Sequence, residues 1–110
     1  MATSLLQKLI EFYQEDPADP FNLYALALEY QKAEKNKARE CFGQLLAEFP
    51  DYLPTYYHAA QFFWNEDETD KAEMTFQKGI QLALHQKNNK TYQELLGSYN
   101  TFREEQLDWE

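Results

Sequence analysis

The residue types that usually carry catalysis or bind metals are scarce in this chain. It contains two histidines, His58 and His85, and one cysteine, Cys41. The histidines lie 27 residues apart, and neither belongs to an HxxxH or HxxE pattern, which would place two ligands on one face of a helix. The surroundings of Cys41 supply no base to activate it, and no second cysteine is present to form a disulfide. The sequence therefore predicts no catalytic residue, no metal site and no cofactor.

Other signatures of reaction chemistry are also absent. The chain has no glycine-rich phosphate loop and no GxSxG motif. Acidic clusters occur at residues 66–68 and 104–105, but they lack the glycine and the closing glutamate of a calcium-binding loop. We interpret them as solvated turns or helix faces. An enzyme is therefore only the remote alternative.

Composition and charge exclude further classes. The 110 residues carry a formal net charge of −9, which disfavours nucleic-acid phosphates and an anionic membrane surface as partners. Hydrophobic residues make up 44% of the chain, too many for a disordered protein, and 3 glycines are few for an all-β one. Neither a signal peptide nor a run of about 18 apolar residues is present. We expect one domain over residues 1–110, in the cytoplasm.

A spaced pattern of large and small residues occurs twice in the chain. The first copy comprises Leu23, Leu26, Ala27, Tyr30, Ala38 and Phe42, and the second comprises Tyr56, Ala59, Ala60, Phe63, Ala72 and Phe76. The shift between the copies is 33 residues in the first half of the pattern and 34 in the second. A period near 34 with helical spacing inside it predicts stacked helix-turn-helix repeats. Such repeats bury their apolar faces only by stacking on one another.

Periodicity, prolines and capping residues predict six helices, all of them antiparallel to their neighbours. Their expected bounds are 4–15, 20–33, 37–49, 54–66, 70–86 and 91–107. Prolines open the second and fourth helices, where the missing N–H costs nothing. The expected N-terminal caps include Ser4, Asp19, Asn36, Asp70 and Thr91, and the last two are followed by Glu73 and Glu94 in capping-box spacing.

The outer helices continue the repeat at both ends. Leu5, Leu9 and Phe12 precede Ala38, Phe42 and Leu45 by 33 residues, so the first helix copies the second helix of a repeat. The last helix copies the first helix of a repeat. Its residues Tyr92, Leu95, Leu96 and Tyr99 lie 36 positions after their counterparts in the second copy, Tyr56, Ala59, Ala60 and Phe63. The expected architecture is half a repeat, two full repeats and a capping helix that acts as a lid.

These spacings resemble the tetratricopeptide repeat (TPR) family over roughly residues 4–107. The strings PFNLYALALEY and PDYLPTYYH are similar to those of small stand-alone bacterial TPR proteins with two central repeats. The resemblance implies an all-α, right-handed solenoid of helical hairpins, a bacterial cytoplasmic origin and no enzymatic activity. One departure is that the family's glycine position holds Ala27 and Ala60, which still permit a close helix crossing.

In the TPR family the first helix of each pair lines a concave groove that binds a partner. Carried over to this chain, the lining residues are Phe21, Tyr24, Leu28, Gln31 and Lys32 on the second helix and Tyr57, His58, Gln61, Trp64 and Asn65 on the fourth. Aromatic side chains supply much contact area for few lost rotamers, so the resemblance implies a site for a peptide or a partner helix. The family's clamp for acidic C-terminal tails is missing, because Tyr24, Leu28 and His58 occupy its positions. An apolar or basic partner segment is favoured.

Two alternatives stay open at the level of sequence. Neighbouring helices, including the last one, could cover the groove aromatics and leave no open site. An uncovered apolar face could instead pair with its own copy and form a homodimer. The sequence names neither the partner nor the pathway.

Overall fold

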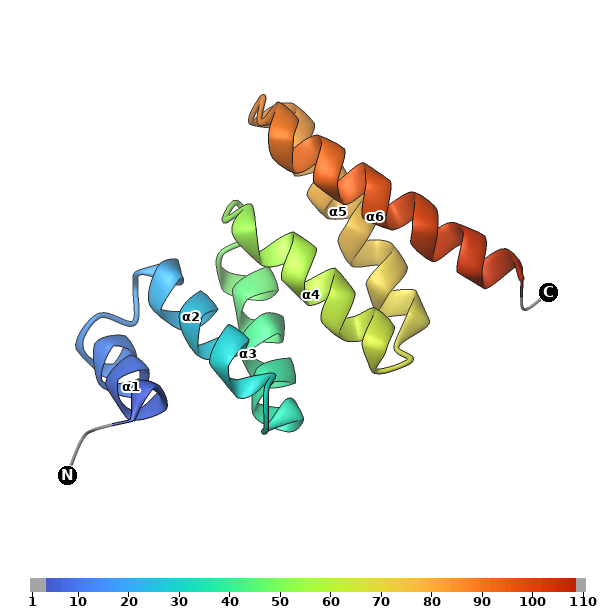
Figure 1. Ribbon diagram of the computed structural model, residues 1–110. Coiled ribbons are helices and arrows are strands. Elements are labelled where there is room, and N and C mark those ends of the chain that lie inside the picture. The colour runs from blue at the N-terminus through green and yellow to red at the C-terminus, as the bar shows by residue number, and fades with distance from the viewer. Residues whose placement is uncertain (1–3, 109–110) are drawn as a thin grey trace. The chain divides into compact units, whose positions relative to one another are not determined.

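The computed structural model describes residues 4–108, and within that range it contains six α-helices and no strand. The helices follow one another from α1 to α6 in Figure 1. Their bounds are Leu5–Glu15 (α1), Pro20–Tyr30 (α2), Lys35–Glu48 (α3), Pro54–Asn65 (α4), Thr69–His85 (α5) and Asn89–Leu107 (α6). The predicted all-α class and the six helices are confirmed.

Two compact units, Met1–Thr55 and Tyr56–Glu110, divide the chain. In the first unit, α1 packs against α2, and α2 packs against α3. In the second unit, α5 packs against α6. Trp64 of α4 contacts both of these helices, because its ring lies edge-on to Phe76 of α5 and Phe102 of α6. That residues 1–110 form one domain stays a prediction.

The repeated pattern supplies the core of each unit. In the first unit Leu23, Leu26, Ala27, Ala38 and Phe42 are buried, whereas the predicted core residue Tyr30 is only half-buried. In the second unit the buried members are Tyr56, Ala59, Ala60, Phe63, Ala72 and Phe76, and α6 adds Leu95 and Phe102. Ala27 and Ala60 are completely covered, as expected for residues that allow neighbouring helices to approach closely.

Gly79 of α5 marks a helix crossing that the sequence pattern did not reveal. A Cβ atom on this glycine would lie 2.6 Å from Cβ of Tyr56 and 3.2 Å from Cδ1 of Leu95. Both neighbours belong to the second unit, on α4 and α6. The missing side chain therefore lets three helices meet at one point of the core.

The first helix is less buried than its repeat positions predict. No side chain within Leu5–Glu15 is fully buried, and Leu5 and Phe12 keep 56% and 52% of their surface exposed. Their counterparts in α3, Ala38 and Leu45, are completely covered. The difference arises because α3 packs against the first helix of its own repeat, whereas no such helix precedes α1 within residues 4–108. The side-chain amide of Asn22 attaches α1 to α2 by donating to the carbonyls of Phe12 and Asp16, at 3.3 and 3.0 Å.

The helix starts agree with the predicted caps at two of five positions. Ser4 accepts the N–H of Gln7, and Asp19 accepts the N–H of Phe21 ahead of Pro20. The predicted caps Asn36, Asp70 and Thr91 are wrong.

Each of those three helices begins earlier than the capping pattern indicates. Asn36 lies in the first turn of α3 and accepts a hydrogen bond from Arg39 at 2.7 Å. Asp70 likewise lies inside the first turn of α5. Asn88 caps α6 instead of Thr91, whose N–H it accepts at 3.0 Å. The residues that precede α3 and α5 are Glu34 and Glu68, and neither side chain makes a capping hydrogen bond.

Candidate partner-binding surface

An aromatic cluster forms around the start of α2 in the first unit. Phe21 is 56% exposed, and its ring centroid lies 6.4 Å from that of Tyr24. Tyr24 in turn meets Tyr52 edge-on, with the centroids 5.7 Å apart. Burial, and then the neighbouring Tyr52, raise the pKa of Tyr24, so its phenol is neutral and presents an apolar ring with a polar tip. Two of the predicted lining residues are thus brought together with a third aromatic side chain that the sequence analysis did not include.

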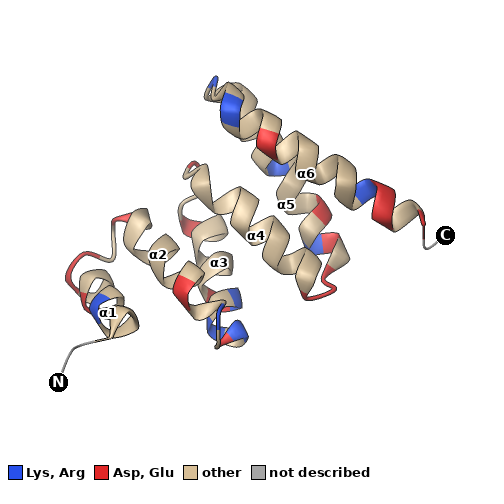
Figure 2. Cartoon of the chain, in the orientation of Figure 1, with Lys and Arg blue, Asp and Glu red and all other residues tan. Residues whose placement is uncertain are grey.

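The remaining residues of the predicted α2 set lie beside or within a basic turn at residues 32–39. Leu28 and Gln31 are half-buried, whereas Lys32 is exposed and pairs with Glu29 at 3.0 Å. Four of the ten basic residues of the chain lie within residues 32–39. Figure 2 shows their blue segments at the turn between α2 and α3.

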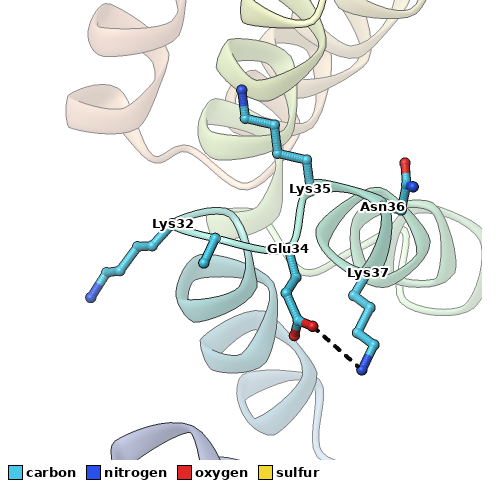
Figure 3. Close-up of a pocket in the computed structure, with 6 residues that line it drawn as sticks. Lys32, Glu34, Lys35, Asn36 and Lys37 are labelled. Atoms are coloured by element: carbon cyan, nitrogen blue, oxygen red, sulfur yellow. Dashed lines mark ion pairs between the residues drawn. The ribbon is translucent and has the colours of Figure 1, made fainter.

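This basic turn surrounds an open pocket of about 560 Å³, shown in Figure 3. Lys37 pairs with Glu34 at 3.8 Å and also lies over the ring of Tyr30, 5.5 Å from its centroid. Lys32 is already paired with Glu29. Since each of these ammonium groups has a local carboxylate three residues earlier, the pocket is a weak place to attract an anion.

The predicted α4 set lies in the second unit and begins with Tyr57 and His58. Their rings meet edge-on with centroids 5.5 Å apart. Both side chains are half-buried. Burial lowers the pKa of His58, because the charged imidazolium loses solvation there. His58 is therefore neutral at pH 7.

The last helix contacts the remaining part of the α4 set. The side-chain amide of Gln61 donates a hydrogen bond to the hydroxyl of Ser98 on α6. Trp64 lies edge-on to Phe102 at a centroid distance of 5.3 Å and to Phe76 at 6.3 Å. α6 thus covers part of the predicted lining, and Trp64 contributes to the core as well as to the surface. Asn65, one residue further along, is exposed.

A second pocket, of about 340 Å³, opens beside these residues. Its lining combines three predicted residues with two acidic ones, namely Gln61, Trp64, Asn65, Asp67 and Glu105. Asp67 comes from the turn after α4, and Glu105 comes from α6. The sequence analysis did not place these two carboxylates together, since the approach of α6 to the end of α4 is not visible in local patterns.

A polar network of side chains also links α5 to α6. The hydroxyl of Tyr99 donates to Oε1 of Glu73 at 3.0 Å, and Arg103 donates to the Tyr99 oxygen at 3.2 Å. The hydrogen bond with Tyr99 raises the pKa of Arg103. Gln77 also donates to Tyr99, at 3.1 Å. Because hydrogen bonds are directional and apolar contacts are not, this network helps to fix the orientation of α6 against α5.

Residues capable of reaction chemistry do not cluster in the described chain. Among residues 4–108, no group of three or more His, Cys, Asp or Glu side chains could hold a metal ion. Cys41 is buried, and burial followed by the charge of Glu40 raises its pKa to about 11. The thiol is therefore protonated at pH 7 and lacks nucleophilic character. Nor does any described helix combine the length and apolar character needed to cross a bilayer.

The ten predicted lining residues thus fall into two sets with different surroundings. The α2 set lies in the first unit around an exposed aromatic cluster and a basic turn. The α4 set lies in the second unit, where α6 contacts two of its members and an acidic pocket adjoins three.

The helix order and the repeated core positions define an all-α protein built from helical-hairpin repeats. The solution NMR structure of a tetratricopeptide repeat domain protein from Salinibacter ruber is 36% identical, with a TM-score of 0.74. The match covers 79% of this chain and 89% of that one. A crystal structure of a tetratricopeptide repeat domain protein from the same organism is 35% identical with a TM-score of 0.73, and the match covers 77% and 97% of the two chains.

The chain therefore belongs to the tetratricopeptide repeat family, as the spacing of its core residues predicted. No family model matches the sequence, and no curated protein matches it. Domains of this family serve in general as protein-interaction modules rather than as catalysts, which agrees with the sequence-based prediction.

Proposed function

We propose that this protein is a non-catalytic interaction module that binds a peptide or a partner helix through the predicted residues of α2 and α4. The observation that carries the proposal is the accessibility of aromatic side chains in both sets. Phe21 is more than half exposed, and Tyr24 and Tyr57 are partly exposed. Aromatic side chains of this kind dominate the energetics of protein interfaces.

Charge narrows the class of partner. With a net charge of −9, the protein attracts basic segments and repels acidic ones at long range. The pairing of Lys32 and Lys37 with nearby glutamates leaves the basic turn with little net attraction for an acidic tail. The proposed partner segment is accordingly apolar or basic, and neither a nucleic acid nor a membrane.

Selection of displayed random peptides, followed by calorimetry with the synthetic peptides obtained, tests this proposal. Phe21→Ser and Tyr57→Ala are each expected to weaken binding by about tenfold, the loss typical of an interface aromatic. Met74→Ser is the matched control, because Met74 is also about half exposed but lies outside both sets. Trp64→Ala is unsuitable, since Trp64 packs against Phe76 and Phe102. Equal affinities for all four proteins would refute the proposed surface.

The exposed face of α1 favours a second candidate function, self-association. Leu5 and Phe12 lie seven residues apart on one side of this helix and are both more than half exposed. A second copy of the chain could cover them and form a homodimer. Light scattering coupled to size exclusion would show a dimer that Leu5→Ser/Phe12→Ser converts to a monomer. A monomeric wild-type protein would exclude this candidate.

A further inference from the structure

The pocket between the end of α4 and α6 has the composition of a site for a positively charged side chain. Two carboxylates, Asp67 and Glu105, lie on its wall, and no lysine or arginine occurs among its described lining residues. Gln61 donates one amide N–H to Ser98, and its carbonyl oxygen can accept a hydrogen bond from a ligand. With the two carboxylates, the lining thus offers several hydrogen-bond acceptors beside the donors of Asn65 and Trp64.

Trp64 gives the pocket an aromatic wall in a fixed position. Its edge-on contacts with Phe76 and Phe102 hold the ring at centroid distances of 6.3 and 5.3 Å. Among the aromatic side chains, the indole ring attracts a cation over its face most strongly. Because the core holds the ring, binding a cation there would cost little conformational entropy.

Carboxylates and an indole together match the chemistry of a guanidinium or ammonium group. A guanidinium can donate to carboxylate oxygens while its plane stacks on an aromatic face. Neither Asp67 nor Glu105 takes part in an ion pair within the described chain. The volume of about 340 Å³ is ample for one such side chain.

We propose that this pocket, lined by Trp64, Asp67 and Glu105, binds an arginine or lysine side chain of the partner protein. The proposal rests on the proposed function, since it assigns one subsite of the interaction surface, adjoining the α4 set. It identifies the partner segment as one that carries a basic residue. Charge complementarity between the acidic pocket and that residue would set the position of the segment along α4.

The first test uses a small probe and the indole N–H of Trp64 as the reporter. Trp64 becomes the sole tryptophan in the variant Trp109→Phe, so its indole gives one signal in a ¹⁵N-labelled sample. Titration with N-acetyl-arginine methylamide is expected to shift this signal saturably. The neutral analogue of the same shape, N-acetyl-citrulline methylamide, is expected to leave it unchanged. Equal shifts with both probes would overturn the proposal.

Matched charge variants separate the pocket from the general acidity of the protein. Asp67→Asn/Glu105→Gln and Glu11→Gln/Glu104→Gln each change the net charge by two, from −9 to −7. Glu11 and Glu104 are exposed and do not line the pocket. Only the pocket variant is expected to bind the arginine probe more weakly, by at least about threefold. If both variants bound the arginine probe equally weakly, the effect would come from net charge, and the proposed site would be overturned.

The selected peptides distinguish failure of the pocket from failure of the proposed function. If peptides bind and depend on Tyr57 but are insensitive to Asp67→Asn/Glu105→Gln, the pocket is wrong and the interaction function stands. If no peptide binds while the arginine probe shifts the Trp64 signal in a pocket-dependent way, the function fails and the cation site stands. A third experiment replaces the basic residue of a bound peptide, arginine by citrulline or lysine by glutamine. If this change weakens binding to the wild type but not to the pocket variant, both the interaction function and the cation site are supported.

Discussion

At the scale of single residues, Gly79 and Gly97 show how the same residue type can have opposite roles. A Cβ atom on Gly79 would lie 2.6 Å from Cβ of Tyr56, an atom held close to the backbone of α4. The space around Gly97 is open, because a Cβ there would have no atom within 4 Å apart from its chain neighbours and the backbone of its own helix. Both glycines lie inside helices, where alanine is intrinsically better by about 1 kcal/mol.

We therefore expect Gly79→Ala to destabilise the protein and Gly97→Ala to stabilise it. The clash at Gly79 costs about 1–3 kcal/mol and outweighs the gain in helix propensity. Gly97→Ala keeps the gain without the clash, about 0.4–1 kcal/mol. Chemical denaturation followed by circular dichroism measures both changes. A stabilised Gly79→Ala protein would mean that α4 and α6 are not as close to α5 as the structure shows.

His58 is expected to make stability depend on pH. Burial holds the pKa of its folded-state imidazole below the ordinary value of 6.5. Below pH 6.5 the unfolded chain takes up a proton that the folded protein does not, so the free energy of unfolding falls as the pH drops through this range. His58→Gln should reduce the loss of stability between about pH 7.5 and about pH 5.5. Identical pH profiles for the two proteins would contradict a desolvated His58.

At the scale of helices, the C-terminal turn of α5 has a residue that is poorly suited to its backbone conformation. Lys87 has a φ of 57°, in the left-handed region. Its N–H donates to Leu84 and the N–H of Asn88 donates to Ala83, so the turn closes the end of α5. Glycine is the residue usually found at such a position, because it has no Cβ to clash there.

Lys87→Gly is accordingly expected to raise the free energy of unfolding by about 0.5–1 kcal/mol, or Tm by about 2–4 °C. Lys90→Gly is the control, since Lys90 lies within α6 and glycine there should lower stability by about 1 kcal/mol. Thermal melts of the two variants decide the matter. Equal destabilisation by both would show that the left-handed turn is absent in solution.

The last helix should be indispensable to the second unit. It buries Leu95 and Phe102, contacts the ring of Trp64 edge-on and donates one hydrogen bond from Tyr99 to Glu73. Exposing several hundred Å² of apolar surface costs many kcal/mol at about 25 cal/mol per Å², comparable with the stability of a small domain. A chain ending at Asn88 is expected to unfold or aggregate, whereas one ending at Leu107 should melt like the full chain. An unchanged Tm for the shorter chain would show that α6 is not a structural lid.

At the scale of the whole molecule, the net charge of −9 opposes compaction. Salt screens this repulsion, so raising NaCl from about 20 mM to about 200 mM should raise Tm by roughly one or two degrees. In the variant Glu11→Lys/Glu104→Lys the net charge is −9 + 4 = −5, and the rise should be smaller. Differential scanning calorimetry measures both. An equal rise would attribute the salt effect to something other than repulsion.

The sequence by itself determined the six helices, the repeat and the core positions of the two full repeats. These features follow from signals contained within one helix or one period, such as the spacing of Leu23, Leu26 and Ala27 or the proline at position 20. Burial of the repeated positions follows as well, because each apolar face must be covered by the next helix. The predicted caps failed at three helices, because each helix begins earlier, among exposed residues where the local sequence offers more than one possible starting point.

Only the tertiary structure decided how the ends of the repeat and the candidate site are built. Leu5 and Phe12 of α1 are residue types that are usually buried, and both are more than half exposed. Their exposure depends on whether another helix packs against that side of α1, which the local sequence does not indicate. Three features depend on where α6 packs: the tight crossing at Gly79, the Glu73–Tyr99–Arg103 network, and the pocket that Asp67 and Glu105 line with Trp64. That residues 67 and 105 line one pocket leaves no local periodic signal, because along the chain each is simply a charged residue on its own element.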